Sequence, residues 1–383
     1  MKKITDINLI GKRVLIRCDL NVPIKNNVIQ DETRIIKSID TIKYALKNAN
    51  KVIIISHLGR IKTREDLEKN SLKIVCERLS NLLNEKIVFC TYEEDVYSII
   101  NNNKIVMLEN TRFFDLDNNK ESNNDKKISE YFASLADVFI NDAFGVLHRE
   151  ASSTVGVSKL LPSAIGFLVE NEINKLSELF NPKKPFSIIL GGNKVSDKIG
   201  IIYNLIDKID NIVIVGKMAF TFLKADGINV LDSMVEENYL SYAKDLLTRF
   251  SDKIILPLDV YEADDINGNN KKLVNIDYIS KEAFDIGPKT IQNIKDKIKL
   301  SKTIFLNGPA GLFENEEFSY GTKTIIEYLN TLNSKIIIGG GDSVNAVNKF
   351  AKNNNFYHIS TGGGASLEFL SGNDLPGLKY IGE

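Results

Sequence analysis

Short runs of β-branched and other apolar residues recur along the whole chain, and a longer stretch with helical periodicity follows most of them. Strands buried on both faces of a parallel sheet have this form, because crossover helices cover both faces. The runs lie at residues 14–17, 52–56, 87–90, 105–108 and 138–141, and then at 186–190, 212–215, 254–257, 303–306, 335–338 and 356–359. Helical stretches such as 35–48 and 72–83 separate them. The pattern predicts an α/β protein with two doubly wound parallel sheets.

A helical segment followed by prolines separates the two sets of strands. Residues 167–180 have the periodicity of a long helix, and the sequence NPKKP follows at 181–185. The first proline ends the helix and the second stiffens the connection, as a link between rigid bodies requires. At about 150 residues per domain, a chain of 383 residues also suggests two domains. We expect one domain over residues 1–170 and a second over 171–370.

The charge balance, the cysteines and the lack of long apolar segments exclude several classes of protein. With 49 basic and 50 acidic residues the net charge is −1, which argues against binding to nucleic acid or to a membrane surface through overall positive charge. Cys18, Cys76 and Cys90 have no C-x-x-C spacing, which argues against a disulfide framework and a zinc site. The N-terminus lacks the apolar region of a signal peptide, and no run of about 18 apolar residues occurs. We therefore expect a cytoplasmic protein with reduced thiols and without a nucleic-acid or membrane partner.

Arginines collect just after the strands of the first half, where ligands of open α/β sheets bind. An arginine fork grips phosphate or carboxylate, so the set predicts a small ligand with several negative charges. Asp19 and Asn21 add acceptors and donors suited to a hydroxyl group. Any one arginine could equally form a surface ion pair, but a whole set at strand ends favours a ligand. The set comprises Arg17, Arg34, Arg60, Arg112 and Arg149, with His57 and His148.

Glycine-rich loops follow the strands of the second half. Glycine lets backbone amides approach a phosphate closely, and a helix that starts there directs its N-terminal amides at the phosphate. We expect such helix starts after Gly341 and Gly364. A single glycine pair would be better explained as a turn, but several at strand ends favour a phosphate ligand. The loops lie at residues 188–198, 214–220, 307–314, 336–344 and 360–369.

Two lysines and one aspartate in these loops suit a magnesium nucleotide. Lys194 and Lys198 are four residues apart, so they would share one face of a helix that opens after Gly192. Asp342 follows a glycine triplet and is a candidate Mg²⁺ ligand, because Mg²⁺ takes one or two carboxylates together with phosphate oxygens. Neither a P-loop nor a G-x-G-x-x-G after a strand is present. A mononucleotide is therefore favoured over NAD.

An anion site in one half and a nucleotide site in the other predict phosphoryl transfer between them. Asp19 is the only carboxylate within the arginine set, so no general base is evident. A hydroxyl acceptor usually needs such a base, whereas a carboxylate acceptor, with a pKa of about 3.5 to 4, is already ionised at pH 7. The sequence therefore favours a kinase with a carboxylate acceptor.

Motifs from both halves make the chain similar to the phosphoglycerate kinase family over nearly its whole length. They are R-x-D-x-N-V-P at 17–23, SHLGR at 56–60, EN-T-R-F at 109–113, NDAFG at 141–145, GG-x-K-V-S-D-K at 191–198, NGP-x-G-x-F-E at 307–314, GGGDS at 339–343 and STGGGAS at 360–366. The resemblance implies two Rossmann-like domains joined by a hinge, with the tail 371–383 packed back on the first. It also implies a monomer that reversibly transfers the acyl phosphate of 1,3-bisphosphoglycerate to MgADP, giving 3-phosphoglycerate and MgATP.

The resemblance assigns the motif residues to three roles. The 3-phosphoglycerate site would comprise Asp19, Asn21, Arg34, His57, Leu58, Gly59, Arg60, Arg112 and Arg149. The nucleotide site would comprise Lys194, Lys198, Asn307, Glu314 at the ribose, Gly340, Gly341, Asp342 at Mg²⁺, and Ser343. Arg34, Lys194, Gly363 and Gly364 would hold the phosphoryl group in transfer.

The chain departs from the family pattern at three positions. Ala151 stands where a second histidine is common, Lys217 where a third glycine is common, and Leu306 where tryptophan precedes N-G-P. The first departure bears on the acidic-ligand site and the second on the adenine pocket.

Two competing functions remain open on the sequence. The first is an NAD-dependent or sugar-phosphate enzyme on the same fold, which the missing dinucleotide motif and the two lysines disfavour. The second is a non-catalytic sensor of nucleotide and anion. A sensor would tolerate the loss of Lys194 or Arg34, yet both are present.

Overall fold

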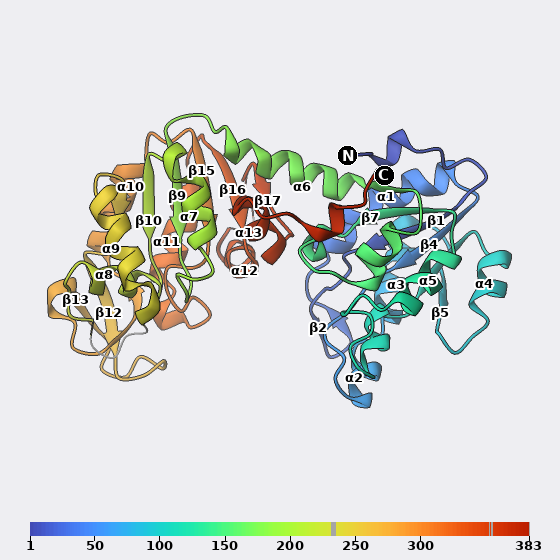
Figure 1. Ribbon diagram of the computed structural model, residues 1–383. Coiled ribbons are helices and arrows are strands. Elements are labelled where there is room, and N and C mark those ends of the chain that lie inside the picture. Colours follow the sequence, from blue (N-terminus) through green and yellow to red (C-terminus); the bar gives the residue numbers. More distant parts are fainter. Residues whose placement is uncertain (231–234, 352, 354, 383) are drawn as a thin grey trace. The chain divides into compact units, whose positions relative to one another are not determined.

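The computed structural model describes residues 1–230, 235–351, 353 and 355–382, which form two units with one parallel sheet each (Figure 1). Unit 1 comprises Met1–Asn174 and the C-terminal segment from Asp374, and unit 2 comprises Lys175–Asn373. Each unit alternates strands with helices along the chain. The predicted fold class, α/β with two Rossmann-like parallel sheets, is confirmed.

The sheet of unit 1 has six parallel strands, and both of its faces are covered. In spatial order the strands are β5 (Val88–Cys90), β6 (Ile105–Leu108), β4 (Lys51–Ile55), β1 (Arg13–Cys18), β7 (Val138–Asp142) and β8 (Ser163–Ile165). The helices are α1 (Thr33–Asn48), α2 (Arg64–Lys69), α3 (Lys73–Leu83), α4 (Val96–Asn102) and α5 (Lys126–Ser134). Val14 and Ile16 belong to one core cluster and Leu15 to another, so β1 buries successive side chains on opposite faces.

The sheet of unit 2 also has six parallel strands. Their spatial order is β11 (Ile254–Ile255), β10 (Asn211–Ile214), β9 (Phe186–Leu190), β15 (Thr303–Asn307), β16 (Lys335–Gly339) and β17 (His358–Ile359). The helices are α7 (Ile199–Leu205), α8 (Ala219–Ala225), α9 (Leu240–Arg249), α10 (Pro288–Ile298), α11 (Tyr320–Leu329), α12 (Gly341–Phe350) and α13 (Gly364–Leu370). Strand order reverses between β9 and β15, and ligands of such sheets bind at this switch point.

A small antiparallel sheet in unit 2 does not follow from the apolar pattern. It consists of β13 (Lys272–Asn275), β12 (Asp259–Ala263) and β14 (Glu282–Ile286). Strand β12 buries Asp259 and Glu262, whose carboxylates accept hydrogen bonds from the side chains of Thr290 and Ser280. Buried acids satisfied by distant partners make this strand look polar in the sequence. The strand β8 and the short hairpin of β2 (Ile24–Lys25) and β3 (Val28–Ile29) were likewise not predicted.

The helix expected from residue 167 is present as α6 (Phe167–Ser177), and a 3-10 turn over Glu178–Phe180 follows it. Asp142 at the end of β7 caps the helix, because its Oδ1 accepts the backbone N–H of Leu168 at 2.9 Å. Burial raises the pKa of Asp142 to about 7. The division between the two units falls within α6, after Asn174.

The C-terminal segment is hydrogen-bonded to unit 1. The backbone N–H of Gly377 donates to the carbonyl of Leu147 at 2.9 Å, and the side-chain amide of Asn141 donates to the carbonyl of Gly377 at 3.3 Å. A Cβ at position 377 would lie 2.8 Å from Cδ2 of Leu147, so the close approach requires glycine.

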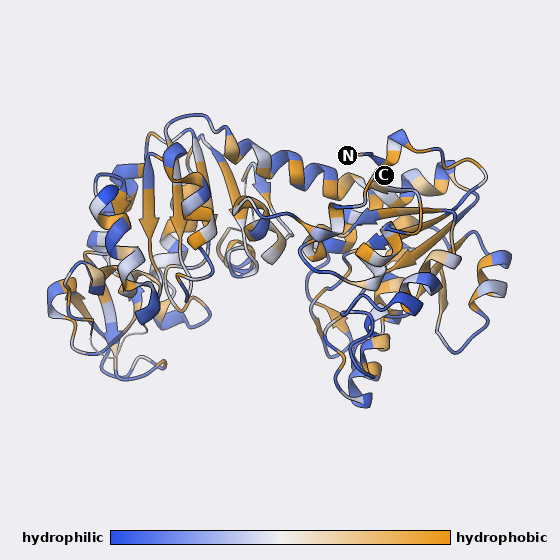
Figure 2. Ribbon diagram, in the orientation of Figure 1, coloured by the Kyte–Doolittle hydropathy of each residue, from blue (hydrophilic) through white to orange (hydrophobic). Residues whose placement is uncertain are grey.

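Hydropathy follows this layered arrangement. The strands of both parallel sheets are hydrophobic, and the outer sides of the helices are hydrophilic (Figure 2). Among the residues that the structure describes, none of the helices has both the length and the apolar character needed to cross a membrane.

Candidate active site

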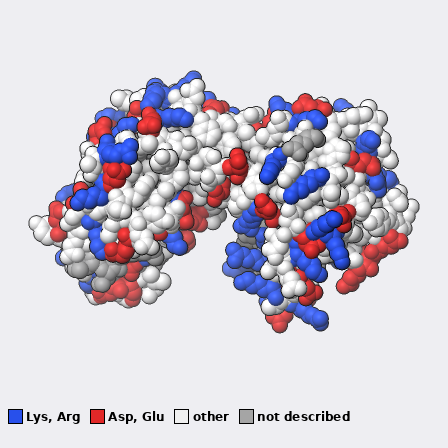
Figure 3. All heavy atoms as spheres, viewed as in Figure 1, with Lys and Arg blue, Asp and Glu red and all other residues white. Residues whose placement is uncertain are grey.

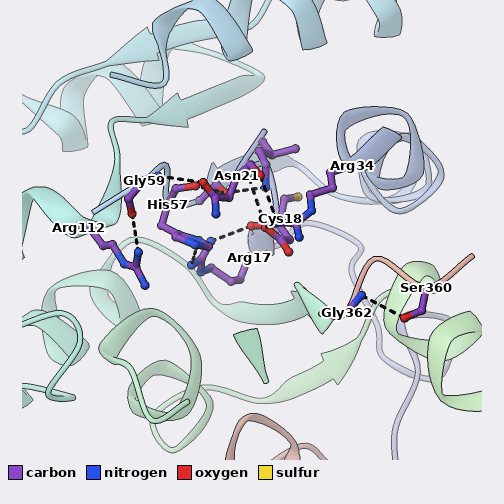
Figure 4. Close-up of polar contacts among 12 residues, drawn as sticks. Arg17, Cys18, Asn21, Arg34, His57, Gly59, Arg112, Ser360 and Gly362 are labelled. Atoms are coloured by element: carbon purple, nitrogen blue, oxygen red, sulfur yellow. Dashed lines mark hydrogen bonds and ion pairs between the residues drawn. The ribbon is translucent and has the colours of Figure 1, made fainter. Parts of the chain in front are cut away.

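The carboxyl ends of β1 and β4 place an arginine against a histidine (Figure 4). The Nη2 atom of Arg17, in β1, lies 3.0 Å from Nδ1 of His57, which follows β4. Both side chains are buried. Because a guanidinium can only donate, Nδ1 accepts, and the proton of the neutral ring lies on Nε2.

His57 is kept neutral by its surroundings. Burial, and then the charges of Arg17, Arg112, Arg34 and Arg149, hold the pKa of His57 well below its usual value. The ring therefore carries no charge at pH 7. It offers a single N–H to a ligand while the surrounding arginines supply the positive charge.

Arg34 is oriented by the turn that follows β1. It stands in the first turn of α1, and its Nη1 donates to Oδ1 of Asp19 at 3.0 Å and to the carbonyl of Asn21 at 3.2 Å. The side chain of Arg34 is 30% exposed, whereas that of Asp19 is buried. Two partners thus hold the guanidinium in place while part of it remains accessible. The side-chain oxygen of Asn21 accepts the N–H of Gly59 at 2.9 Å, which ties this turn to the loop after β4.

The loop after β4 is held through its backbone carbonyls. Nδ2 of Asn110 donates to the carbonyl of Leu58 at 2.7 Å, and Nη1 of Arg112 donates to the carbonyl of Gly59. Gly59 has φ of +60°, and a Cβ there would lie 2.4 Å from Oδ1 of Asn70. Any other residue would have to displace the Asn70 side chain and adopt a left-handed conformation, so this position favours glycine and the glycine of the SHLGR motif has a local structural role.

Arginines from different parts of unit 1 converge on a cavity of about 40 Å³. Its lining comprises Arg17, His57, Arg112, Glu121, Ser122, Val146, Arg149, Ala151 and Thr154. Arg149 is exposed on one side, with its Nε 3.1 Å from Nε2 of His148. Arg60 lies on the surface, beside the loop that carries His57. On the visible face of unit 1, basic side chains gather near β2, whereas the tip at α2 carries both acidic and basic side chains (Figure 3).

In unit 2 a cavity of about 170 Å³ lies beyond the carboxyl ends of β9 and β15, at the switch point of the sheet. The antiparallel sheet supplies its opposite wall through β12 and β14. Apolar side chains with a few charged groups form the lining, as is typical of sites for small organic ligands. The lining includes Phe220, Val260, Phe284 and Leu312, and the charged residues Lys217, Asp285, Glu314 and Asp342.

The prediction that Lys194 and Lys198 share a helix face is wrong. Helix α7 begins only at Ile199, and the residues before it form a loop. The carboxylate of Glu236 accepts the backbone N–H groups of Val195 and Ser196, the latter at 3.3 Å, and these bonds hold the loop outside the helix.

The two lysines therefore have different environments. Lys194 is exposed, whereas Lys198 is buried and its Nζ donates to Oδ1 of Asn307. Burial lowers the pKa of Lys198, and the carboxylates of Asp197 and Asp342 oppose this shift.

A buried amide at the end of β15 faces the start of α12. Within the described residues, Nδ2 of Asn307 has no hydrogen-bond partner. A Cβ at Gly340 would lie only 2.9 Å from this nitrogen, and Gly340 has φ of +88°. The hydroxyl of Ser343 accepts the N–H of Gly308 at 2.6 Å, which joins the loop after β15 to the first turn of α12. An unpartnered donor beneath a glycine turn suits an anionic ligand.

Helices begin where the glycine loops predict them. Helix α12 starts at Gly341 with the exposed Asp342 in its first turn, and α13 starts at Gly364. Gly363 has φ of +52°, which glycine adopts readily. The N–H of Gly362 donates to Oγ of Ser360 at 3.1 Å (Figure 4).

The three departures from the family pattern lie in defined places. Ala151 lines the cavity of unit 1. Lys217 lines the cavity of unit 2 and forms an ion pair with Glu282. Leu306 is buried in the core of unit 2, where it packs as an ordinary apolar residue.

Sequence reasoning missed three residues that support the predicted ones. Glu236 holds the loop of Lys194, while Glu121 contacts Ser153, and Ser153 contacts Arg17. No local signal identifies them, because each acts through a contact between segments far apart in the chain. Glu121, moreover, lies in an asparagine-rich stretch that is typical of a solvated loop.

The chain has extensive matches among known proteins. The family model of phosphoglycerate kinase matches residues 4–373. The phosphoglycerate kinase of Fusobacterium nucleatum is 48% identical over 395 residues, covering 100% of this chain and 99% of that protein. That of Enterococcus faecalis is 45% identical over 394 residues, covering 100% and 99%.

Solved structures agree with these sequence matches. The phosphoglycerate kinase of Coxiella burnetii has a TM-score of 0.84 at 35% identity, covering 99% of this chain and 98% of that one. That of Pyrococcus horikoshii has a TM-score of 0.85 at 27% identity, covering 100% and 98%.

Proposed function

Because the chain belongs to the phosphoglycerate kinase family, we propose that unit 1 binds 3-phosphoglycerate and that unit 2 binds the magnesium nucleotide. The enzyme reversibly transfers the acyl phosphate of 1,3-bisphosphoglycerate to ADP, as its family does. One observation supports the division of ligands: the cavity of unit 1 is lined by arginines, whereas that of unit 2 is largely apolar. The alternative of a non-catalytic sensor is not supported.

The acidic substrate would be bound by charge and by directed hydrogen bonds in unit 1. Arg112 and Arg149 line the cavity with His57, and their guanidinium groups can neutralise phosphate and carboxylate oxygens. The neutral His57 can donate from Nε2 to an oxygen of the same ligand. The set of binding residues is completed by Asp19, Asn21, Arg34, Leu58, Gly59 and Arg60.

The nucleotide would lie over the loops of unit 2. The free Nδ2 of Asn307 and the ammonium group of Lys198 suit phosphate oxygens, as do the backbone N–H groups at the start of α12. The start of α12 comprises Gly340, Gly341, Asp342 and Ser343. The base would enter the apolar cavity, whose lining also carries Glu314 for the ribose hydroxyls.

The residues present fit a magnesium ion that the nucleotide brings. Asp342 is an exposed carboxylate that lines the nucleotide cavity, and no cluster of three or more acidic, histidine or cysteine ligands occurs among the described residues. A single carboxylate is the usual protein contribution where phosphates supply the other oxygens. Bound Mg²⁺ neutralises charge on the phosphate oxygens.

Asp342→Asn is therefore expected to weaken the use of Mg-nucleotide. We expect a KM for MgADP about tenfold higher and saturation at a higher Mg²⁺ concentration, because one metal ligand loses its charge. Steady-state kinetics at several Mg²⁺ concentrations measure both effects. Glu316→Gln, at an exposed position of the 3-10 turn Glu316–Phe318, is the matched control. An unchanged Mg²⁺ dependence would show that Asp342 serves only the first turn of α12.

The phosphoryl group in transfer would be held by Arg34 from unit 1 and by Lys194, Gly363 and Gly364 from unit 2. The acceptor is a carboxylate that is ionised at neutral pH, so no residue has to remove a proton. These groups act by stabilising the charge that develops on the transferring oxygens during an in-line displacement.

Ligands bound to different units must meet before transfer, and water must be excluded. We therefore expect the radius of gyration to fall when 3-phosphoglycerate and MgADP are both bound, with the hinge at residues 167–185. Only the ternary complex gives both units new contacts, so each ligand alone should cause a smaller change. Small-angle scattering on the free protein, both binary complexes and the ternary complex measures this. Equal radii in all four states would contradict hinge closure.

Two experiments test the proposal. Formation of ATP from ADP and 1,3-bisphosphoglycerate, followed in a coupled assay, tests the activity. Calorimetry with single ligands tests the division of the ligands between the two units, because Arg112→Ala should weaken 3-phosphoglycerate binding and leave MgADP binding unchanged.

We further propose a cytoplasmic monomer, in keeping with the three buried, unpaired cysteines Cys18, Cys76 and Cys90.

A further inference from the structure

A continuous chain of buried polar side chains lies directly behind His57. The backbone N–H of Ser153 donates to Oε2 of Glu121 at 3.1 Å, and the hydroxyl of Ser153 donates to Oε1 of the same carboxylate. Nε of Arg17 donates to the hydroxyl of Ser153 at 3.0 Å, and Nη2 of Arg17 lies 3.0 Å from Nδ1 of His57. None of the four residues is more than 4% exposed.

The direction of every hydrogen bond in this chain follows from its two ends. Arg17 can only donate, and its Nη1 already donates to the carbonyl of Cys18 at 2.7 Å, so the oxygen of Ser153 and Nδ1 of His57 must accept from its other nitrogens. The single hydroxyl proton of Ser153 is then left for Glu121, which accepts it. The only arrangement in which every contact is satisfied leaves His57 with its proton on Nε2. Glu121, through Ser153, and the carbonyl of Cys18 together fix the orientation of Arg17, and Arg17 fixes the tautomer of His57.

Charge supports the same relation between Glu121 and Arg17. A buried guanidinium is costly unless anions compensate it. Burial lowers the pKa of Arg17, and the charges of Glu121 and Asp19 oppose this shift. Asp19 is engaged by Arg34, and the nearby Asp115 accepts the N–H and hydroxyl of Ser122 at 2.8 and 2.6 Å. Glu121 is the carboxylate that reaches Arg17 through Ser153.

We propose that Glu121 is a positioning residue, which acts through Ser153 and Arg17 to present His57 as a neutral Nε2–H donor to the acidic substrate. The proposal rests on the assignment of the substrate site to unit 1. Glu121 also lines the same cavity as Arg17 and His57, so a shift of its carboxylate would change the wall of the site directly. Neither Glu121 nor Ser153 belongs to the motifs that identify the family in this sequence.

Glu121→Gln and Ser153→Ala test the proposal, because each interrupts the series of hydrogen bonds from Glu121 to His57 at a different point. Glutamine keeps the volume but loses the charge, and alanine removes the hydroxyl that joins Glu121 to Arg17. Each variant should raise the KM for 3-phosphoglycerate about tenfold, as expected for the loss of a hydrogen bond to a charged group. The kcat should stay within about twofold of wild type and the Kd for MgADP should not change, because transfer and nucleotide groups are untouched.

Nitrogen NMR of the histidine rings gives a readout that is independent of substrate. The chain has only three histidines, His57, His148 and His358, so His57→Gln assigns the signals. In the wild type at pH 8, above the raised pKa of Glu121, His57 should be in the neutral Nε2–H form, because the charges of Arg17, Arg34, Arg112 and Arg149 face it. In both variants we expect a mixture of the two neutral tautomers, because Arg17 is no longer held against Nδ1 of His57.

Asp142→Asn is the matched control for a purely structural effect. Asp142 is as deeply buried as Glu121 and lies in the same unit, but its carboxylate caps α6. Burial raises the pKa of both carboxyls to about 7. If Glu121→Gln and Ser153→Ala lowered the melting temperature as Asp142→Asn does, yet left the His57 signals and the KM unchanged, the positioning role would be refuted.

The failure of the substrate-site assignment has a different signature. If the His57 signals move in both variants while His57→Gln binds 3-phosphoglycerate normally, the hydrogen-bonded chain is real but the site lies elsewhere. If the signals stay fixed while His57→Gln weakens binding, the site is correct and the proposed role of Glu121 is wrong.

Discussion

Arg34→Ala is expected to lower kcat by a factor of about 100 or more, because the guanidinium stabilises charge that grows on the phosphoryl group during transfer. The structure favours this role because Asp19 and Asn21 orient Arg34 while 30% of its side chain remains exposed. The fold should be preserved, but we expect a lower melting temperature, because the variant leaves the buried carboxylate of Asp19 without its ion pair. Initial rates with both substrates saturating measure kcat, and thermal unfolding checks the fold.

Arg78→Ala is a matched control for this variant. Arg78 also belongs to unit 1, and its guanidinium pairs with Glu32 at 2.7 and 2.8 Å. Its side chain is 38% exposed, close to the value for Arg34. Arg78→Ala should therefore leave kcat unchanged. A near wild-type kcat for Arg34→Ala would remove Arg34 from the transfer step, whereas a raised KM alone would make it a substrate-binding residue.

Lys194→Ala is expected to lower kcat to a similar extent, by a factor of about 100 or more, because it removes a cation at the transferring phosphoryl group. Lys194 is exposed, so its ammonium group can reach a ligand. The loop that carries it is anchored by Glu236 through the backbone of Val195 and Ser196 and should keep its conformation in the variant. Single-turnover measurements separate the transfer step from product release.

Lys224→Ala provides the comparison for Lys194→Ala. Lys224 is another exposed lysine of unit 2, and it pairs with Glu237 on the surface. It should be replaceable without loss of activity. If Lys194→Ala weakened only the binding of MgADP, with an unchanged single-turnover rate, Lys194 would be a nucleotide ligand rather than part of the transfer machinery.

The parallel sheets could be predicted because their strands are apolar on both faces. Leu15 and Ile16 contribute to different core clusters, so the sequence shows an unbroken apolar run. Strand β12 could not be predicted in this way, because Asp259 and Glu262 are buried in it. Their partners, Thr290 and Ser280, come from later in the chain, and no local pattern reveals them.

In the candidate site, too, the sequence predicts residues that depend on local pattern and misses those that depend on partners far along the chain. Motif residues such as His57 and Asn307 stand at strand ends, where a sequence pattern predicts ligands. The environments of Lys194 and Lys198 were misjudged, because the carboxylate of Glu236 holds the loop before α7. Glu121 was missed since its role depends on Ser153, which is distant in the chain.

The packing of the C-terminal segment on unit 1 has a consequence for biosynthesis. A ribosome makes residues 374–382 only after all of unit 2, so the nascent unit 1 lacks the contacts of Gly377 with Leu147 and Asn141 while unit 2 is being translated. Domains otherwise fold in the order in which they are synthesised. Here the first unit to emerge is the last to be completed, and its final contacts form after translation has passed through both units.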